Sequence, residues 1–257
     1  MKSNPNKLIY NTFYVPAQLE FAPATPYDAW MIDLRRSLVR KYCIGKDALD
    51  LCCGSGTYLV DLLGDVKWIV GLDFSRNLID AAAQKISSKV PSVATLVEGD
   101  AQCLPFVDEC FDTVFSLASL YYVPDVRQAI GETARVLRPG GVAILDLGNS
   151  RSLATLTGVL SHALYGWAKS YAIPYKEILK AITSAGLVIE QHHASQILPL
   201  FGPRLVQMLL PFSISLFKYP LGLKVGGRTL DSILCNMPLL RRVAFRHLFV
   251  LRKSLRA

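Results

Sequence analysis

The sequence predicts an open α/β fold in which a mostly parallel sheet carries helices on both faces. Short apolar runs bounded by turn residues alternate with stretches of helical periodicity, the order expected of parallel strands joined by crossover helices. In addition, the glycine turn Gly54-Ser55-Gly56 separates the first apolar run, residues 48–51, from a helix that starts at Thr57. Such a turn places helix amides beside the carboxyl end of a strand, where open α/β sheets bind ligands.

The glycine turn differs from two common nucleotide-binding patterns. A dinucleotide fingerprint would need a third glycine where Leu59 stands, and the turn lacks the lysine of a phosphate loop. Asp50, just ahead of the turn, would repel a pyrophosphate but suits a cationic amino-acid ligand. Taken alone, the stretch is also compatible with an ordinary strand–turn–helix corner of another α/β protein.

Length and composition favour one domain in the cytoplasm. A chain of 257 residues holds one large α/β domain with an elaboration. Hydrophobic residues make up 51% of it, but the longest apolar stretch, residues 205–217, is shorter than the ~20 residues of a membrane-spanning helix. No apolar core of a signal peptide follows the first residues. The six cysteines show no C-x-x-C spacing, so we expect reduced thiols and no metal site.

The positive charge of the chain is concentrated near its end. Residues 197–257 contain ten basic residues and one acid, Asp231, a net charge of +9 that leaves −1 for everything before them. A basic region of this kind is compatible with an RNA or an anionic membrane surface, and equally with basic side chains that point into water.

The order of the elements follows from the apolar pattern. Helices are expected at residues 29–39, 57–63, 77–85, 125–136, 152–170 and 174–185. Further strands are expected at residues 66–73, 94–98, 111–117, 142–147, 187–192 and 245–253.

Four short motifs follow the expected strands in order. They are Asp50-x-x-x-Gly54-x-Gly56, Gly71-Leu-Asp73-Phe-Ser, Gly99-Asp-Ala-x-x-Leu-Pro-Phe and Arg135-Val-Leu-Arg-Pro-Gly-Gly. In this order and spacing they resemble the class I S-adenosylmethionine-dependent methyltransferases, strongly over residues 47–147. The resemblance implies a Rossmann-like, doubly wound sheet of seven strands, the last antiparallel, in one domain that spans residues 1–257.

The resemblance also assigns roles in binding S-adenosylmethionine. Asp73 lies about twenty residues beyond the glycine turn, at the end of the next strand, where a carboxylate can accept both hydroxyls of a ribose. The methionine portion is assigned to Asp50, Gly54 and Gly56, the ribose to Asp73, the adenine to Phe74, Asp100 and Ala101, and the region beneath the sulfonium to Ser116 and Leu117.

The acceptor side is less closely specified. Methyl transfer is an in-line displacement, so alignment and desolvation can supply most of the acceleration, although an oxygen acceptor can need a base. The candidates for catalysis are Tyr121, Tyr122 and His192, and for substrate contact Tyr14, Tyr27 and Tyr121. Each histidine is more often a packing residue than a base.

Three segments are expected to form a helical lid over the substrate: residues 1–45, 150–172 and the insertion 194–244. The insertion lies between the last two strands, where the family has a short link, and helices are expected within it at residues 204–217, 228–235 and 238–243. Its apolar positions with sparse basic residues favour a lipophilic substrate, or peripheral contact with a membrane, over RNA. A lid helix packed on the core is the plain alternative.

The predicted function is therefore methyl transfer to a small hydrophobic metabolite: a natural product of secondary metabolism, a quinone-like compound or a lipid-like compound. The core motifs are similar to the ubiquinone/menaquinone C-methyltransferase group, although the N-terminal pattern of that group is not evident. No N/D-P-P-Y/F motif follows the fourth strand, so DNA is not expected as a substrate. The alternatives are an RNA methyltransferase that uses the basic region and a non-catalytic partner that only binds the cofactor.

Overall fold

A seven-stranded sheet forms the centre of the molecule. The computed structural model describes residues 5–12, 26–87, 93–166, 168–197 and 221–255. The strand order is β3-β2-β1-β4-β5-β9-β6, and β9 runs antiparallel to both of its neighbours. This arrangement confirms the predicted fold class. The strands are β1 (Asp47–Leu51), β2 (Trp68–Asp73), β3 (Ala94–Glu98), β4 (Phe111–Ser116), β5 (Leu137–Gly148), β6 (Leu187–Ser195) and β9 (Arg246–Lys253).

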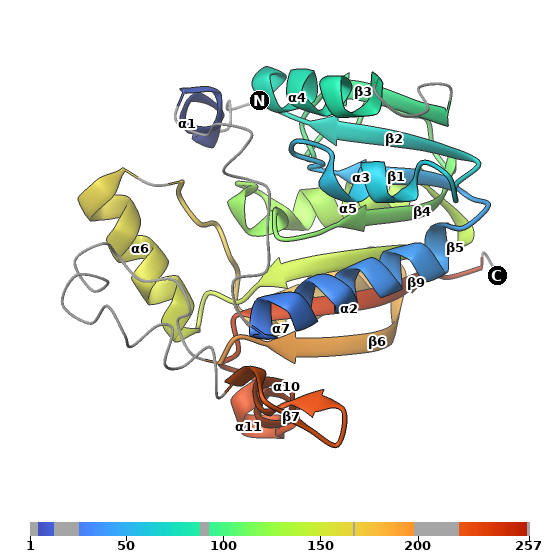
Figure 1. Cartoon of the computed structure of the whole chain (residues 1–257). Coiled ribbons are helices and arrows are strands. Elements are labelled where there is room, and N and C mark those ends of the chain that lie inside the picture. The colour runs from blue at the N-terminus through green and yellow to red at the C-terminus, as the bar shows by residue number, and fades with distance from the viewer. Residues whose placement is uncertain (1–4, 13–25, 88–92, 167, 198–220, 256–257) are drawn as a thin grey trace.

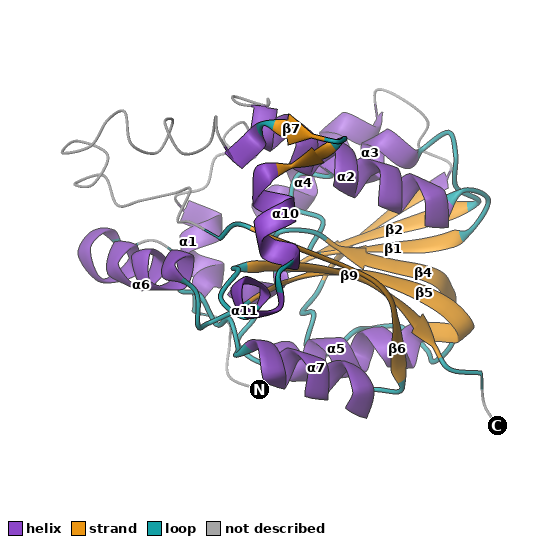
Figure 2. Cartoon of the chain, turned by 90° about the horizontal axis from the view of Figure 1, so that it is seen from below, coloured by secondary structure: helices purple, strands orange, loops and turns teal. Residues whose placement is uncertain are grey.

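Helices cover both faces of this twisted sheet (Figures 1 and 2). One face packs against α2 (Pro26–Cys43), α3 (Thr57–Leu62) and α4 (Arg76–Ser87). The other packs against α5 (Val126–Val136) and α7 (Tyr175–Ser184). Alternate residues of each strand point to opposite faces. In β1, for example, Ala48 belongs to the core of the first face, whereas Leu49 and Leu51 belong to the core of the second.

The remaining elements lie around the carboxyl ends of the strands. They are α1 (Asn6–Thr12), the short helix η3 (Leu120–Tyr122), α6 (Leu153–Tyr165), the hairpin β7 (Lys224–Val225) and β8 (Arg228–Thr229), α10 (Leu230–Asn236) and α11 (Pro238–Arg241). Figure 1 shows α6 standing apart from the sheet, with α1 between it and α4. Among the described residues, no helix is long and apolar enough to span a membrane.

Most of the predicted elements match within a few residues, but the insertion was wrong in part. A helix was expected over residues 228–235, whereas residues 224–229 form a hairpin and the helix begins at Leu230. Gly226 and Gly227 both have positive φ values, 58° and 79°, which a two-residue hairpin turn requires. The expected helix at residues 204–217 lies outside the described part of the chain.

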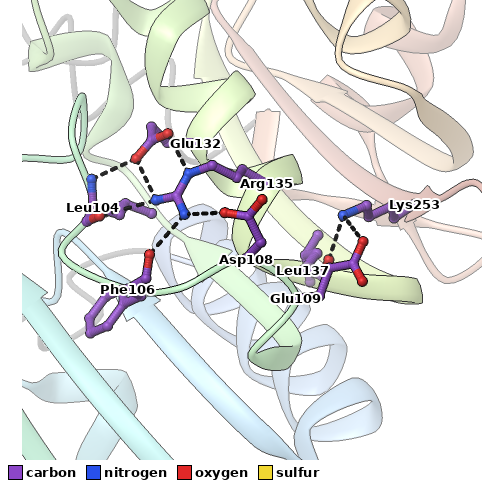
Figure 3. Close-up of polar contacts among 8 residues, drawn as sticks. All are labelled: Leu104, Phe106, Asp108, Glu109, Glu132, Arg135, Leu137 and Lys253. Atoms are coloured by element: carbon purple, nitrogen blue, oxygen red, sulfur yellow. Dashed lines mark hydrogen bonds and ion pairs between the residues drawn. The ribbon is translucent and has the colours of Figure 1, made fainter.

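Two of the sequence motifs hold each other in place. Arg135, the first residue of the fourth motif, lies in the last turn of α5. It donates to the carbonyls of Phe106 at 2.8 Å and Leu104 at 3.1 Å, and pairs with Glu132 and Asp108 (Figure 3). Glu132 in turn accepts from the Leu104 amide at 2.7 Å. Arg135 therefore fixes the loop that follows Asp100 to α5 and thereby positions the backbone of that loop.

Candidate active site

A cavity of about 440 Å³ opens at the carboxyl ends of β1, β2, β3 and β4. Loops after the strands form its floor, and α1, α2 and α6 contribute its walls. Ten of the residues singled out from the sequence line it: Tyr27, Asp50, Gly54, Asp73, Phe74, Asp100, Ala101, Leu117, Tyr121 and Tyr122.

Asp50 presents an unsatisfied carboxylate oxygen to this cavity. The residue is 3% exposed, and its Oδ2 has no hydrogen-bond partner in the described part of the protein. Burial raises the pKa of Asp50 well above its usual range, and the neighbouring Asp73 raises it further. Because a buried polar group without a partner is costly, this oxygen fits a cationic or donor group of a ligand.

Asp73 is held rigidly beside the glycine turn. Its Oδ2 accepts from the Gly54 amide at 2.9 Å and its Oδ1 from the Ser75 amide at 2.9 Å. Burial raises the pKa of Asp73 to about 6, although these backbone hydrogen bonds oppose the shift. The carboxylate is therefore oriented before a ligand arrives, and each oxygen keeps a lone pair for a hydroxyl donor.

Asp100 is positioned by a residue that the sequence reasoning missed. The amide of Gln102 donates to Asp100 Oδ1 at 2.9 Å, and its side-chain Nε2 lies 3.0 and 3.1 Å from the two carboxylate oxygens. Gln102 also accepts from the Asp125 amide at 2.9 Å, which ties this loop to the start of α5.

Two non-glycine residues in the floor adopt left-handed backbone conformations. Cys52, after β1, has φ 61° and Ala118, after β4, has φ 60°, and both line the cavity. Such conformations cost on the order of 1–3 kcal/mol and are concentrated at ligand sites. The Ser119 hydroxyl donates to the Leu117 carbonyl at 3.0 Å and contacts the Cys52 carbonyl at 3.4 Å, which links the two strained turns.

An aromatic rim, defined by Tyr10, Phe74 and Tyr122, joins α1 to the floor. The Tyr10 ring packs edge-on against Phe74 at 5.5 Å and against Tyr122 at 6.1 Å between centroids. Buried Asn6 fastens the same helix, because its Nδ2 donates to the carbonyls of Tyr122 at 3.1 Å and Lys169 at 2.9 Å.

Asn11 fastens the other end of α1. Its side-chain oxygen accepts from the Ser75 hydroxyl at 2.6 Å, and its carbonyl accepts from the Asn77 side chain at 2.6 Å. Together, Asn6 and Asn11 hold α1 across the cavity between the loop after β2 and η3.

One wall of the cavity contains two arginines of a buried cluster of charges, defined by Arg35, Asp146 and Arg246. Both arginines contact Asp146 Oδ2, Arg246 Nη1 at 3.1 Å. Burial alone would raise the pKa of Asp146, but the charges and hydrogen bonds of the two arginines outweigh it and lower that pKa. The Arg246 guanidinium also lies over the Tyr121 ring, 5.3 Å from its centroid.

Tyr27 closes the cavity from the start of α2. The residue is 4% exposed, and its hydroxyl donates to Asp231 Oδ2 at 3.1 Å. Burial raises the pKa of Tyr27 well above its usual range, with Asp231 as the second cause. Asp231 also accepts from the amides of Gln196 at 2.7 Å and Ile197 at 3.0 Å, so the insertion is anchored to the wall of the cavity.

Three predicted site residues do not line the cavity, and a fourth lies outside the described part of the chain. Gly56 has φ 76° and faces Ala82, where an added Cβ would approach the Ala82 Cβ to 3.0 Å; its place is the contact between α3 and α4. Ser116 is fully buried beneath the floor. Tyr14 falls among residues 13–25, outside the described part of the chain.

His192 lies on the opposite face of the sheet. It stacks on Phe249, with which it is paired in register, and its Nε2 is 2.9 Å from Nδ1 of His247. Burial, followed by the charges of His247 and Arg241, lowers the pKa of His192 to about 3. Asp146 and Arg246 point to the face covered by α2, so the structure does not bring this histidine together with the other candidates.

The charged cluster is the main functional feature that the sequence reasoning missed. Asp146 interrupts the apolar run of β5 and is 1% exposed, and Arg35 lies on the buried side of α2 with Met31 and Leu38. A charged residue at a core position needs a buried partner, and that signal was available. Among the described residues, no group of acids, histidines and cysteines is arranged to hold a metal ion.

Comparisons with known proteins agree with this architecture. An S-adenosylmethionine-dependent methyltransferase from Mesorhizobium loti superposes with a TM-score of 0.60 at 17% identity, covering 88% of this chain and 99% of that one. The cyclase SpnF superposes with a TM-score of 0.61 at 19% identity, covering 93% and 86%. At these identities the two structures establish the fold alone.

Sequence similarity establishes the family. A family model described as a methyltransferase domain matches residues 49–145. A demethylmenaquinone methyltransferase from Bacillus cereus (strain B4264) is 32% identical over 187 residues, which cover 70% of this chain and 78% of the relative. The chain belongs to the class I S-adenosylmethionine-dependent methyltransferase family, and the protein is a methyltransferase enzyme.

Proposed function

We propose that the protein transfers a methyl group from S-adenosylmethionine to a small hydrophobic metabolite. The observation that carries the proposal is the pairing, in one cavity, of the unsatisfied Asp50 carboxylate and the preorganised Asp73 carboxylate with an acceptor side rich in aromatic residues. The name of the relatives, demethylmenaquinone methyltransferase, supports a quinone-like acceptor within this class.

The residues present fit the donor. Asp50 Oδ2 would bind the ammonium of the methionine portion beside Gly54, and Asp73 would accept the two ribose hydroxyls. Phe74 would pack on the adenine, with Asp100 and Ala101 at its edge. S-adenosylmethionine supplies a methyl group on a positively charged sulfur, and Leu117 lies in the part of the floor assigned to that sulfur.

The protein's contribution to the reaction is alignment and exclusion of water. The strained turns at Cys52 and Ala118 fix the backbone beneath the reacting atoms, and α1, clamped by Asn6 and Asn11, covers the donor side. Tyr121 and Tyr122, which line the cavity, would contact the acceptor. His192 lies outside the cavity and takes no part in this proposal.

The exposed apolar surface of α6, beside the cavity, supports a hydrophobic acceptor. Ala154, Thr155 and Gly158 of α6 line the cavity, whereas Leu156, Leu160 and their neighbours on the same helix are exposed. In this proposal α6 and the insertion, whose Gln196 lines the cavity, form the lid expected from the sequence within a single domain. The exposed aliphatic side chains of α6 are Leu153, Leu156, Val159, Leu160 and Leu164, and their exposed fractions run from 47% to 67%.

Peripheral contact with a membrane is part of the same proposal. An exposed apolar helix surface of this kind is typical of proteins that lie on a lipid interface, and α6 also forms a wall of the cavity. A lipophilic acceptor could then reach the cavity beside α6 without crossing water.

The basic region offers less support for RNA as the acceptor. Of its basic residues, Arg246 is bound to Asp146, Arg252 to Glu190 and Lys253 to Glu109 and the Leu137 carbonyl at 2.7 Å. These residues hold the last strand in the sheet and do not form a free cationic surface.

Transfer of labelled methyl into a whole-cell extract tests the proposal. We expect label in the organic-soluble fraction, abolished by Asp73→Ala because losing two hydroxyl bonds to a carboxylate weakens donor binding about 100-fold. Asp80→Ala, at an exposed acid of α4 paired with Arg76, is the matched control and should leave transfer unchanged. Label in RNA would overturn the hydrophobic acceptor, and donor binding without any transfer would indicate a non-catalytic partner.

A further inference from the structure

Two buried guanidinium groups share one carboxylate in the cluster Arg35–Asp146–Arg246. The side chain of Arg35 is 9% exposed, that of Arg246 14% and that of Asp146 1%, and both arginines line the cavity. Both contact the same oxygen, Asp146 Oδ2. The cluster thus carries one positive charge in excess, which is costly in a protein interior unless an anion completes it.

The arginines keep donors available for such an anion. Arg35 Nε is buried and has no hydrogen-bond partner within the described ranges of the chain. Arg246 uses Nε on Gln196 Oε1 at 2.9 Å and Nη1 on Asp146, and it also bonds to the Tyr121 side chain. Arg35 bonds to the Tyr58 side chain as well, and both tyrosines line the cavity. A guanidinium has five N–H donors in a planar fork that matches a pair of anionic oxygens.

The acids near the cluster do not neutralise its excess positive charge. Asp28 lines the cavity from the first turn of α2, two helical turns or about 10 Å from Arg35 along the helix. Asp231 accepts from two backbone amides and from the Tyr27 hydroxyl. Asp50 and Asp73 lie at the ends of β1 and β2, on the donor side.

The register of the sheet places the cluster next to the site of transfer. Leu145 of β5 is paired with Ser116 of β4, so Asp146 is level with Leu117 on the neighbouring strand, about 4.8 Å away between strand axes. An acceptor held by the arginines would therefore have its anionic end close to the methyl group of the donor.

We propose that Arg35 and Arg246 bind an anionic oxygen of the acceptor, so that the enzyme selects hydrophobic metabolites carrying a carboxylate or an ionised phenol or enol. This inference rests on the proposed function and specifies its substrate. The ring of Tyr121, which stacks against Arg246, supplies the apolar surface beside that oxygen.

Binding the acceptor as an anion removes the need for a protein base during transfer. The acceptor loses its proton to water on binding and keeps an electron pair on oxygen or on a conjugated carbon. That pair forms the new bond to the methyl carbon, and the electrons of the broken carbon–sulfur bond remain on sulfur. A negative acceptor and a positive donor thus give two neutral products, and the arginines stabilise the reactive form beforehand.

Binding of two matched probes tests the inference without requiring turnover. We would measure the affinities of 2-naphthoate and its neutral analogue 2-naphthamide for the full-length protein saturated with S-adenosylhomocysteine. We expect a preference of about tenfold or more for naphthoate, as a charge-assisted pair provides. Arg246→Met should abolish this preference, and Arg246→Lys should retain part of it. Arg40→Met, on the exposed side of α2 and paired with Asp65, should leave it unchanged.

The affinity for S-adenosylhomocysteine, measured on each variant, shows whether the fold and the donor site are intact. Equal affinities for the two probes, no binding of naphthoate, or a preference that survives Arg246→Met would each overturn the inference. Because the extract experiment does not depend on these probes, anion selection can fail while methyl transfer to a neutral hydrophobic acceptor stands. Conversely, failure of the extract experiment leaves the probe preference measurable.

Discussion

The floor of the cavity is formed by the loops after the strands, and its cover by α1 and α6. These two regions are held by different kinds of contact. In the floor, Asp73 binds the amides of Ser75 and Gly54, which are 2 and 19 residues away in the sequence. In the cover, Asn6 of α1 bonds to carbonyls that are 116 and 163 residues away. The floor is thus encoded in short motifs, whereas the cover depends on side chains that only the complete fold brings together.

The cluster Arg35–Asp146–Arg246 ties α2 to β5 and β9 beside these two regions, and the largest effect is expected there. Asp146→Ala leaves two buried guanidinium groups without a counter-charge, so the free energy of unfolding should fall by about 3–5 kcal/mol. Chemical denaturation measures this change. Asp65→Ala, which removes an exposed pair with Arg40, should cost less than about 1 kcal/mol. Similar losses of unfolding free energy for the two variants would show that the buried cluster stabilises the fold no more than an exposed ion pair does.

The second-largest effect on the free energy of unfolding concerns Asp73, in the floor of the cavity, and depends on pH. The pKa of Asp73 is about 6 in the folded protein, above its ordinary 3.8, so folding favours the protonated form. Its contribution to stability is present below about pH 4 and is lost as the pH rises through 6. Relative to Asp73→Asn, the ligand-free protein should therefore lose up to about 3 kcal/mol between pH 4 and pH 7.

Urea denaturation of both proteins across this range measures that difference. The other buried acids are common to the two chains, so the comparison isolates Asp73 and its coupling to Asp50. Parallel pH profiles would show that the floor does not hold Asp73 in a state prepared for hydroxyl donors.

The smallest effect on the free energy of unfolding is expected in α6, which is part of the cover. Leu156→Ser combined with Leu160→Ser changes two exposed side chains of α6, so each substitution should shift the free energy of unfolding by no more than about 0.5 kcal/mol. The same double variant should lose co-sedimentation with vesicles that contain anionic lipid. Val188→Ser, at an exposed aliphatic residue of β6, is the control. Vesicle binding that is unchanged in the double variant would contradict the lipid-facing role of α6.

The same contrast explains what the sequence could predict. The positions of the seven strands along the chain and of Asp50, Asp73 and Asp100 follow from local patterns, because each acid lies near the carboxyl end of a strand whose apolar run is visible. The position of His192 could not be predicted, since only the pairing of β6 with β9 decides which face its ring takes. In the sequence Arg246 is one of several residues of a basic region. Only the pairing of β9 with β5 decides that its side chain lines the cavity.

Helix α1 was missed for a further physical reason. Its seven residues carry no strong apolar periodicity, and an isolated helix of that length is not stable in water. Its helical form depends on Asn6, Asn11 and the packing of Tyr10 on the aromatic rim.

The clamped helix therefore couples local folding to ligand exchange. In the proposed arrangement α1 covers the donor, so opening of the asparagine bonds would uncover it, and an undocked segment of seven residues loses its helical structure. The free energy of winding this one segment would then be part of the affinity for the donor, and its unwinding would be one step of product release. Substitutions in α1 that touch no ligand would consequently alter turnover through the stability of this one short helix.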